Sequence, residues 1–270
     1  MSPNRVTVQD GRVTVRRRAA YALLMIAAVA CTRSVEPASP GAASPAPIAP
    51  GSAIPAYVAK LPPVLPLGDT FVVRSLTPDL SIWRGPTIRF GRKFIFPTVN
   101  PVGQSLAFLV TGTARDGAGN PWLHVLLPIR PNEAAGWVKK TDVRVMPVDE
   151  KIVVDLSQRT LVHYRGGRVV DRFSVGIGRP ETPTAAGTFY VWARVPQASA
   201  VGPYGVFALG LSGFSPVLKN WPGGGRMAIH GTANSTDRGQ MVSHGCVRVL
   251  NADMVTLEKV PLGTPVIIRR

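Results

Sequence analysis

The chain has 270 residues, of which 45% are apolar; this is enough to bury a core, so a wholly disordered protein is excluded. With only two cysteines, Cys31 and Cys246, a disulfide scaffold and a cysteine-rich zinc module are also excluded. The 31 Lys and Arg residues exceed the 15 Asp and Glu residues, and the net charge of +16 favours anionic partners such as nucleic acid, acidic lipid or an anionic cell wall.

Residues 1–31 have the pattern of an export signal. Arginines precede an uncharged apolar run from Ala19 to Ala30, and small residues lead into Cys31. As a helix this run is about 18 Å long, which is shorter than a bilayer core and argues against a permanent transmembrane helix. The segment Ala28-Val29-Ala30-Cys31 resembles a bacterial lipobox, which implies a lipid anchor at Cys31. An ordinary secreted protein and a retained signal anchor are the alternatives.

Residues 32–66 are predicted to be an extended linker. The part from Val35 to Pro66 is rich in Pro, Ala and Ser and carries only two charged residues, Glu36 and Lys60. Such a composition buries too little apolar surface to fold alone and favours polyproline II. A spacer between an anchor and a globular head fits this composition, and a passive low-complexity segment is the alternative.

Residues 67–147 are predicted to form a small β domain, since short strand-like runs alternate with Gly and Pro turn signals. The run from Trp122 to Leu127, followed by Gly136-Trp137-Val138, resembles the SH3-like barrels of bacterial wall proteins. The tryptophans at 83, 122 and 137 are either core residues or the lining of a ligand groove. The predicted strands are 70–74, 80–84, 106–111, 122–127 and 136–140.

Residues 149–270 are predicted to form a second β-rich domain with few short helices. Gly166 and Gly167 suit the primed turn of a hairpin, because glycine tolerates the positive φ that this turn needs. The predicted strands are 152–156, 160–164, 169–175, 187–193, 206–211, 227–230 and 264–268.

One helix is predicted after Leu250. Asn251 is expected to be its N-cap, and Pro261 with Gly263 should end it. The apolar side chains Met254, Leu257 and Val260 would form one buried stripe along this helix, because their spacing places them on one face.

Chemically reactive residues gather between 230 and 248. His230 ends a strand-like run, and Cys246 is expected in the loop just before the helix. A thiol reacts as its thiolate, so a nearby imidazole can activate Cys246 by taking its proton or by forming an ion pair with it. Gly245 leaves room for a substrate carbonyl to reach backbone N–H groups, and Arg248 offers positive potential to a carboxylate.

Two other interpretations of this cluster remain at this point. Cys246 and the two histidines are compatible with ordinary core residues. A zinc site of His230, His244 and Cys246 is compatible with the spacing, but the sequence offers no evident fourth ligand. We therefore expect no metal and no cofactor.

The order of these residues resembles the signature of the L,D-transpeptidase catalytic domain. In that family a strand-end histidine precedes a Ser/Thr-His-Gly-Cys segment, as His230 precedes Ser243-His244-Gly245-Cys246 here. The resemblance covers most of residues 149–270 and implies that fold. Further matching pieces, in chain order, are Thr182-Pro183-Thr184, Gly187-Thr188-Phe189, Ala208-Leu209-Gly210-Leu211, Ile229-His230-Gly231-Thr232 and Val260 to Val266.

The resemblance also implies a mechanism. Cys246 would attack the carbonyl of the third residue of a peptidoglycan tetrapeptide stem, D-Ala would leave, and a neighbouring amine would resolve the thioester into a 3→3 cross-link. His230 would be the general base and then the acid, and the amides at His244, Gly245 and Cys246 would hold the oxyanion. His244 would order the loop. The residues expected to bind substrate are Ser243, Arg248 and Gly231.

The expected partners are therefore stem peptides, as donor and amine acceptor, and anionic cell wall polymers, in the cell envelope outside the cytoplasm. No nucleic-acid motif accompanies the positive charge, so nucleic acid is not expected. Three alternative functions are an L,D-carboxypeptidase of the same fold, another thiol peptidase of the wall, and a wall-binding adaptor without catalysis.

Overall fold

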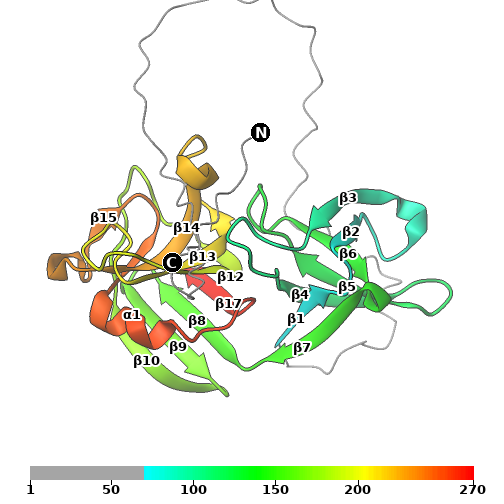
Figure 1. Cartoon of the computed structure of the whole chain (residues 1–270), viewed down its shortest axis with the longest axis horizontal. Helices are drawn as coiled ribbons and strands as arrows, with labels where there is room; N and C mark the ends of the chain where they lie inside the picture. The colour runs from blue at the N-terminus through cyan, green and yellow to red at the C-terminus, as the bar shows by residue number, and fades with distance from the viewer. Residues whose placement is uncertain (1–69) are drawn as a thin grey trace, which may run out of the picture. The chain divides into compact units, whose positions relative to one another are not determined.

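The computed structural model describes residues 70–270, so the expected export signal, the lipid anchor at Cys31 and most of the linker lie outside the described residues. Within this part, two large β-sheets follow each other along the chain, and α1 (Asn251–Leu257) is its one α-helix (Figure 1). None of its helices has the length and apolar character needed to cross a membrane. The described part is therefore mainly β, as the sequence predicts.

The first sheet has seven antiparallel strands in the order β3-β2-β6-β5-β4-β1-β7. Its core is a cluster of buried apolar side chains that includes Phe108 and Leu123. Trp122 and Trp137 are buried beside Ala114, so these two are core residues, and the half-buried Trp83 packs against them. The strands are β1 (Thr70–Ser75), β2 (Asp79–Trp83), β3 (Arg92–Pro97), β4 (Phe108–Arg115), β5 (Pro121–Leu126), β6 (Ala135–Lys139) and β7 (Val143–Val148), with short 3-10 turns at Ile88–Phe90 and Lys140–Asp142.

Two strands of this sheet were not expected from the sequence, and they are its two edges. β3 contains Pro97 and β7 contains Pro147. A proline cannot donate to a strand ladder and is a turn signal in a sequence, but an edge strand tolerates it because one side of the strand has no partner. These two segments can therefore form strands in spite of their prolines, because both lie at an edge of the sheet.

The second sheet has eight strands in the order β10-β9-β8-β17-β12-β13-β14-β16. Pairing is antiparallel except between β8 and β17 and between β14 and β16. The strands are β8 (Glu150–Asp155), β9 (Thr160–Arg165), β10 (Arg168–Ser174), β12 (Gly187–Pro196), β13 (Phe207–Phe214), β14 (Arg226–Thr232), β16 (Val247–Leu250) and β17 (Pro265–Arg269); a small parallel pair, β11 (Ile177–Gly178) and β15 (Met241–Ser243), and 3-10 turns at Pro222–Gly225 and Ser235–Asp237 accompany them.

Two expectations around the helix are wrong. Cys246 does not lie directly before the helix, because β16 intervenes and pairs with β14. Asn251 is not the N-cap: Leu250 occupies that position, and the Asn251 side chain accepts from the Val206 amide (3.1 Å) and donates to the Ala200 carbonyl (2.8 Å). The tertiary contact with the 200–206 segment thus outcompetes a local cap.

The expected apolar stripe is confirmed for Met254 and Leu257, but α1 ends at Leu257, earlier than Pro261 and Gly263 predicted, so Val260 lies beyond the helix. Met254, Leu257 and Val260 are fully buried and belong to the core of the second sheet. The same core includes Ile229 and Val247, which flank His230 and Cys246 in the chain. The helix therefore packs against β14, which contains His230, and against β16, which directly follows Cys246.

The two sheets share a buried apolar cluster. Val72, Leu109 and Leu126 of the first sheet pack with Tyr190 of β12, and Leu262 contacts the same cluster. Polar contacts cross as well: Asn132 donates to the Phe214 carbonyl and accepts from its amide, both at 2.8 Å. The first sheet thus contacts the strand that leads into the loop beside Cys246.

Candidate active site

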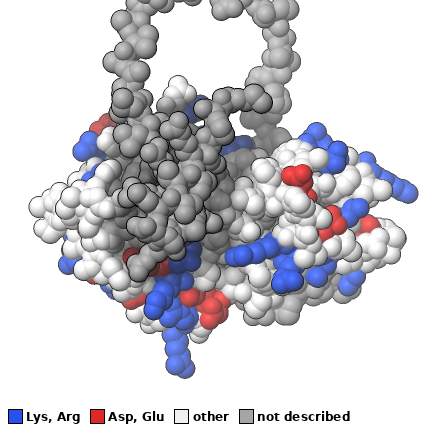
Figure 2. All heavy atoms as spheres, in the orientation of Figure 1, with Lys and Arg blue, Asp and Glu red and all other residues white. Residues whose placement is uncertain are grey.

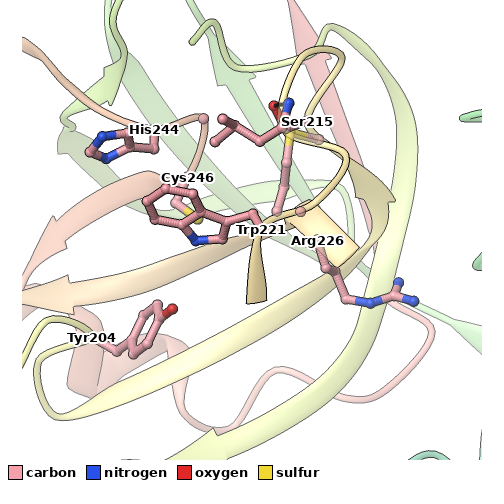
Figure 3. Close-up of a pocket in the computed structure, with 10 residues that line it drawn as sticks. Tyr204, Ser215, Trp221, Arg226, His244 and Cys246 are labelled. Carbon is pink, nitrogen blue, oxygen red and sulfur yellow. Dashed lines mark hydrogen bonds between the residues drawn. The ribbon is translucent and has the colours of Figure 1, made fainter. Parts of the chain in front are cut away.

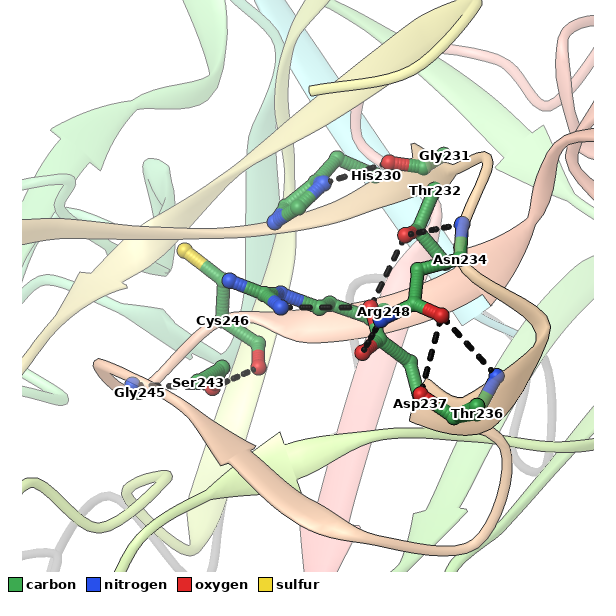
Figure 4. Close-up of polar contacts among 10 residues, drawn as sticks. All are labelled: His230, Gly231, Thr232, Asn234, Thr236, Asp237, Ser243, Gly245, Cys246 and Arg248. Carbon is green, nitrogen blue, oxygen red and sulfur yellow. Dashed lines mark hydrogen bonds and ion pairs between the residues drawn. The ribbon is translucent and has the colours of Figure 1, made fainter. Parts of the chain in front are cut away.

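His230 lies near the end of β14 with 3% of its surface exposed. Its Nδ1 is 2.8 Å from the Gly231 carbonyl, and because a carbonyl can only accept, Nδ1 carries the proton of this hydrogen bond. In the neutral ring, Nε2 is then free to accept. Figure 4 shows this second nitrogen on the side of the ring that faces the Cys246 sulfur.

Burial lowers the pKa of His230 to about 4. The Arg248 cation lowers this pKa too, while the hydrogen bond to Gly231 and the Asp237 carboxylate raise it. The imidazole is therefore neutral at neutral pH and able to accept a proton.

Cys246 is half-buried and directly precedes β16. Burial raises the pKa of its thiol, and the Ala228 backbone and the Arg248 cation lower it in part. At neutral pH the resting state is consequently a neutral thiol beside a neutral imidazole. Of the two modes of activation left open by the sequence, proton transfer during attack fits these directions better than a preformed ion pair.

The turn before Cys246 is closed by Ser243, whose side chain is buried. Ser243 Oγ donates to the Cys246 carbonyl at 2.5 Å and accepts from the Gly245 amide at 3.1 Å. Gly245 has a φ of +114°, which side-chain-bearing residues rarely adopt. Ser243 and Gly245 therefore shape the loop, and the Gly245 amide is engaged within it.

His244 is exposed, and its side chain forms part of a cavity wall instead of pointing toward β14 and β16. Its ring stacks on Trp221, with centroids 5.1 Å apart and planes at 24°. Both side chains line a cavity of about 50 Å³ together with Cys246 (Figure 3). The position suits contact with a substrate at the entrance to the thiol.

Arg248 is held by a buried carboxylate. Its Nη1 lies 3.1 Å from Asp237 Oδ2, and Thr232 Oγ1 donates to the same oxygen at 2.8 Å (Figure 4). The side chain of Asp237 is 4% exposed, whereas that of Arg248 is 28% exposed. The cation is thus fixed next to both His230 and Cys246, and it affects the pKa of each.

Gly231 does not face the cavity, in contrast to the expectation that it binds substrate. It is buried, and a Cβ at this position would meet the Asn251 side chain and, at 2.9 Å, the Val206 amide. Its carbonyl instead holds the His230 ring. A close approach between two chain segments explains this glycine.

Several side chains that the sequence did not indicate surround His230 and Cys246, which together are called the reactive pair. Tyr204 meets the His230 ring edge to face at 5.1 Å, and Trp221 stacks on His244. Asp237 orients Arg248. No local sequence pattern predicts these contacts, because each contact joins two segments that come together only when the chain folds. The remaining cavity residues are Ser215, Leu218, Gly225, Arg226, Met227 and Gly245.

In the described range 70–270, no three His, Cys, Asp or Glu side chains are arranged to hold a metal ion. His244 in particular is turned toward Trp221. Cys246 is the free cysteine of this range.

Comparison with known proteins identifies relatives of the second sheet. Residues 149–268 match the family model described as YkuD, L,D-transpeptidase catalytic domain. The protein named YkuD of Bacillus licheniformis is 33% identical over 149 residues, covering 52% of this chain and 82% of that protein. YkuD of Bacillus subtilis is 36% identical over 120 residues, covering 44% of this chain and 65% of that protein. The chain thus spans less than two thirds of the Bacillus subtilis relative.

Solved structures with similarity include a crystal structure of an Enterococcus faecium L,D-transpeptidase variant. It is 27% identical, with 45% of this chain and 50% of that chain covered and a TM-score of 0.36. An L,D-transpeptidase from Mycobacterium smegmatis is 15% identical, with 56% and 90% covered and a TM-score of 0.36.

Proposed function

We propose that this chain, which belongs to the L,D-transpeptidase family, cross-links peptidoglycan through a thioester on Cys246. The family acts on peptidoglycan stem peptides. The donor would be a tetrapeptide stem that loses D-Ala, and the product would be a 3→3 cross-link. His230, Cys246 and the loop from Ser243 to Gly245 would carry the chemistry.

One observation supports this proposal most strongly: the tautomer of His230 is fixed by its bond to the Gly231 carbonyl. That bond assigns the proton to Nδ1 and leaves Nε2, the nitrogen facing Cys246, as a base (Figure 4). The lowered pKa of His230 keeps this base unprotonated at neutral pH. If His230 were only a structural core residue, neither a free Nε2 nor a neighbouring thiol would be required.

In the acylation step, Cys246 Sγ attacks the carbonyl carbon of the third stem residue while Nε2 of His230 takes the thiol proton. The imidazolium then returns this proton to the amine of D-Ala as the C–N bond breaks, and the thioester remains. The oxyanion needs backbone donors. We assign this role to the amides of Cys246 and His244, because the Gly245 amide is bonded to Ser243.

In the second step, an amine of a neighbouring stem attacks the thioester carbonyl. Nε2 of His230 accepts the proton that the amine loses and passes it to the departing Cys246 sulfur, so the enzyme returns to its starting form. Arg248 would attract a stem carboxylate, and the wall of His244 and Trp221 would contact the stem backbone.

The surface and the N-terminal region fit the same setting. Lys and Arg side chains are spread over the face shown in Figure 2, which suits anionic wall polymers, although Asp and Glu lie among them. Export by residues 1–31, with or without a lipid at Cys31, would bring the enzyme to its substrate. The first sheet would then act as a wall-facing SH3-like domain.

The test uses the chain with Cys31 changed to Ser, so that Cys246 is its only thiol. Incubation with a disaccharide-tetrapeptide, followed by mass spectrometry, should give a 3→3 dimer and free D-Ala. We expect Cys246→Ala to lose about a thousandfold or more in rate and His230→Gln about a hundredfold. The Cys31→Ser parent is the matched control.

Other outcomes would select other functions. Tripeptide and D-Ala without dimer, even with excess amine acceptor, would indicate an L,D-carboxypeptidase. Activity that survives in Cys246→Ala would contradict the proposed nucleophile. An inert parent chain that still binds purified sacculi would support the adaptor.

A further inference from the structure

The loop of residues 215–225, between β13 and β14, forms one wall of the cavity at Cys246. Ser215, Leu218, Trp221 and Gly225 line this cavity, and Trp221 carries the ring that stacks on His244. In Figure 3 the indole lies beside the cysteine and the His244 ring. The placement of this loop therefore decides how much of the thiol a substrate can reach.

Most hydrogen bonds within the loop close short turns, such as those from the Lys219 amide to the Val217 carbonyl at 3.1 Å and from the Gly224 amide to the Trp221 carbonyl at 2.8 Å, and one bond joins its two ends. The Ser215 amide donates to the Gly225 carbonyl at 2.7 Å, and Ser215 Oγ accepts from the amides of Val217 and Leu218. Its end is the glycine run from Gly223 to Gly225, where all three φ values are positive. Glycine has the largest conformational freedom to lose on ordering, so such a loop needs outside contacts to hold one position.

Arg130, which belongs to the segment between β5 and β6 of the first sheet, supplies such contacts. Its Nη1 donates to the Ser215 carbonyl at 2.9 Å, and its Nη2 donates to the carbonyls of Leu218 at 3.3 Å and Gly224 at 3.0 Å. These acceptors lie at the start, in the middle and at the end of the loop. Hydrogen bonds from a charged donor are stronger than those between neutral groups.

Neighbouring contacts fix Arg130 against the base of the loop. Its guanidinium lies 4.8 Å from the centroid of the Phe214 ring, and Arg226 lies over the same ring at 4.3 Å. Asn132, two residues further along the chain, pairs with both backbone polar groups of Phe214. Residues 130–132 thus bind both the end of β13 and the 215–225 loop.

We propose that Arg130 is a positioning residue for the reaction, which holds the 215–225 loop so that Trp221 stays stacked on His244 at the entrance to Cys246. The first sheet would then contribute to donor binding without touching the donor. This inference rests on the proposed function for its kinetic consequence, but the positioning itself is a property of the loop and is measurable without turnover.

The direct test is hydrogen exchange of the loop amides in the full chain with Cys31→Ser, with and without Arg130→Ala. We expect the amides of Val217, Leu218 and Gly224 to exchange about tenfold faster in the variant, with β16 unchanged. Arg144→Ala removes an exposed arginine from β7 of the same sheet and should leave the loop unchanged. Unchanged loop exchange in Arg130→Ala would overturn the proposal, whether or not the chain cross-links peptides.

The kinetic test separates positioning from chemistry. In Arg130→Ala, KM for the donor should rise about tenfold while kcat falls less than about threefold, and Arg130→Lys should recover part of the loss. Iodoacetamide, which is small enough to bypass the loop, should alkylate Cys246 at a rate within about twofold of the parent. Equal losses of kcat and of alkylation rate would contradict a positioning role and indicate general damage to the site.

A double-mutant cycle tests whether Arg130 acts through Trp221. Trp221→Ala should raise KM by about the same factor as Arg130→Ala, and the double variant should be no worse than Trp221→Ala alone. Fully additive effects would show that Arg130 affects the site by another route and would reject the link to Trp221. If the parent chain proves inactive on peptidoglycan, the proposed function fails, and the exchange experiment still decides the positioning role.

Discussion

Arg248 acts on both members of the reactive pair because a buried carboxylate fixes its cation. Asp237 accepts from Arg248 and from Thr232, so the guanidinium has a defined place. A positive charge stabilises a thiolate and destabilises an imidazolium, and it therefore lowers the pKa of Cys246 and of His230. The cation therefore favours the thiolate form of Cys246 and the neutral form of His230, which are the forms that the proposed function requires.

The pH profile of Cys246 alkylation tests this electrostatic role. Arg248→Gln removes the cation, so the pKa of Cys246, already raised by burial, should rise further. The alkylation profile should move to higher pH, and the rate at pH 7.5 should fall about threefold, because a smaller fraction of the thiol is ionised at that pH. Arg248→Lys keeps the charge and should stay close to the parent profile. If Arg248→Gln and the parent gave superimposable pH profiles, the electrostatic role of Arg248 would be contradicted.

At the scale of elements, an ionic cluster joins the first three strands of the second sheet. His163 of β9 is fully buried, and its Nε2 lies 2.8 Å from Glu150 of β8 while its Nδ1 lies 2.9 Å from Asp171 of β10. Arg165 also donates to Glu150. Each ring nitrogen of His163 therefore contacts a carboxylate from a neighbouring strand. The cluster therefore fixes the register of β8, β9 and β10.

Removing this histidine should destabilise the sheet without affecting the reactive pair. In His163→Ala, both carboxylates lose their shared partner, and we expect the free energy of unfolding to fall by about 3 kcal/mol. Chemical denaturation measures this loss, and iodoacetamide alkylation of Cys246 under native conditions should remain at the parent rate. His163→Gln, which can donate to one carboxylate, should lose less. A loss equal to that of an exposed substitution such as Arg168→Ala would show that the cluster contributes little.

At the scale of the whole described part, the two sheets meet where Gly263 approaches β1. Gly263 has a φ of +89°, and an added Cβ would lie 2.7 Å from a methyl group of Val72 and 3.0 Å from the Cβ of Ala107. Together with the shared apolar cluster, this close packing predicts that both sheets unfold in one transition.

Gly263→Ala tests how tightly the sheets are joined. Backbone strain and the contact with Val72 should together lower the free energy of unfolding by about 2–4 kcal/mol. Gly166→Ala is the matched control: its φ is +57°, but an added Cβ meets no atom within 4 Å, so it reports strain alone. Adding Val72→Ala to Gly263→Ala should relieve part of the contact penalty. Equal losses in the two glycine variants, or two separate unfolding transitions, would contradict close packing of the sheets.

The amino-acid sequence by itself determined the family and the mainly β fold, and it singled out His230 and Cys246 as the candidate reactive pair. These follow from local patterns: alternation and turn residues predict strands, and a short signature holds the reactive residues in a fixed order. The helix stripe of Met254 and Leu257 was also predictable, because it depends on the helical repeat alone. The edge strands β3 and β7 were not predicted, because proline is a turn signal in a sequence. Only the assembled sheet shows that these two strands lie at its edges, where proline is tolerated.

Tertiary structure alone decided how the site is held. The sequence placed Gly231 with the substrate, whereas folding packs it under Asn251 and uses its carbonyl to set the tautomer of His230. Asp237 and Trp221 carry no local signal. Arg130 meets carbonyls that are 85 to 94 residues away in the chain. Such contacts depend on which surfaces the sheets bring together, and no periodicity or spacing along a single segment encodes that choice.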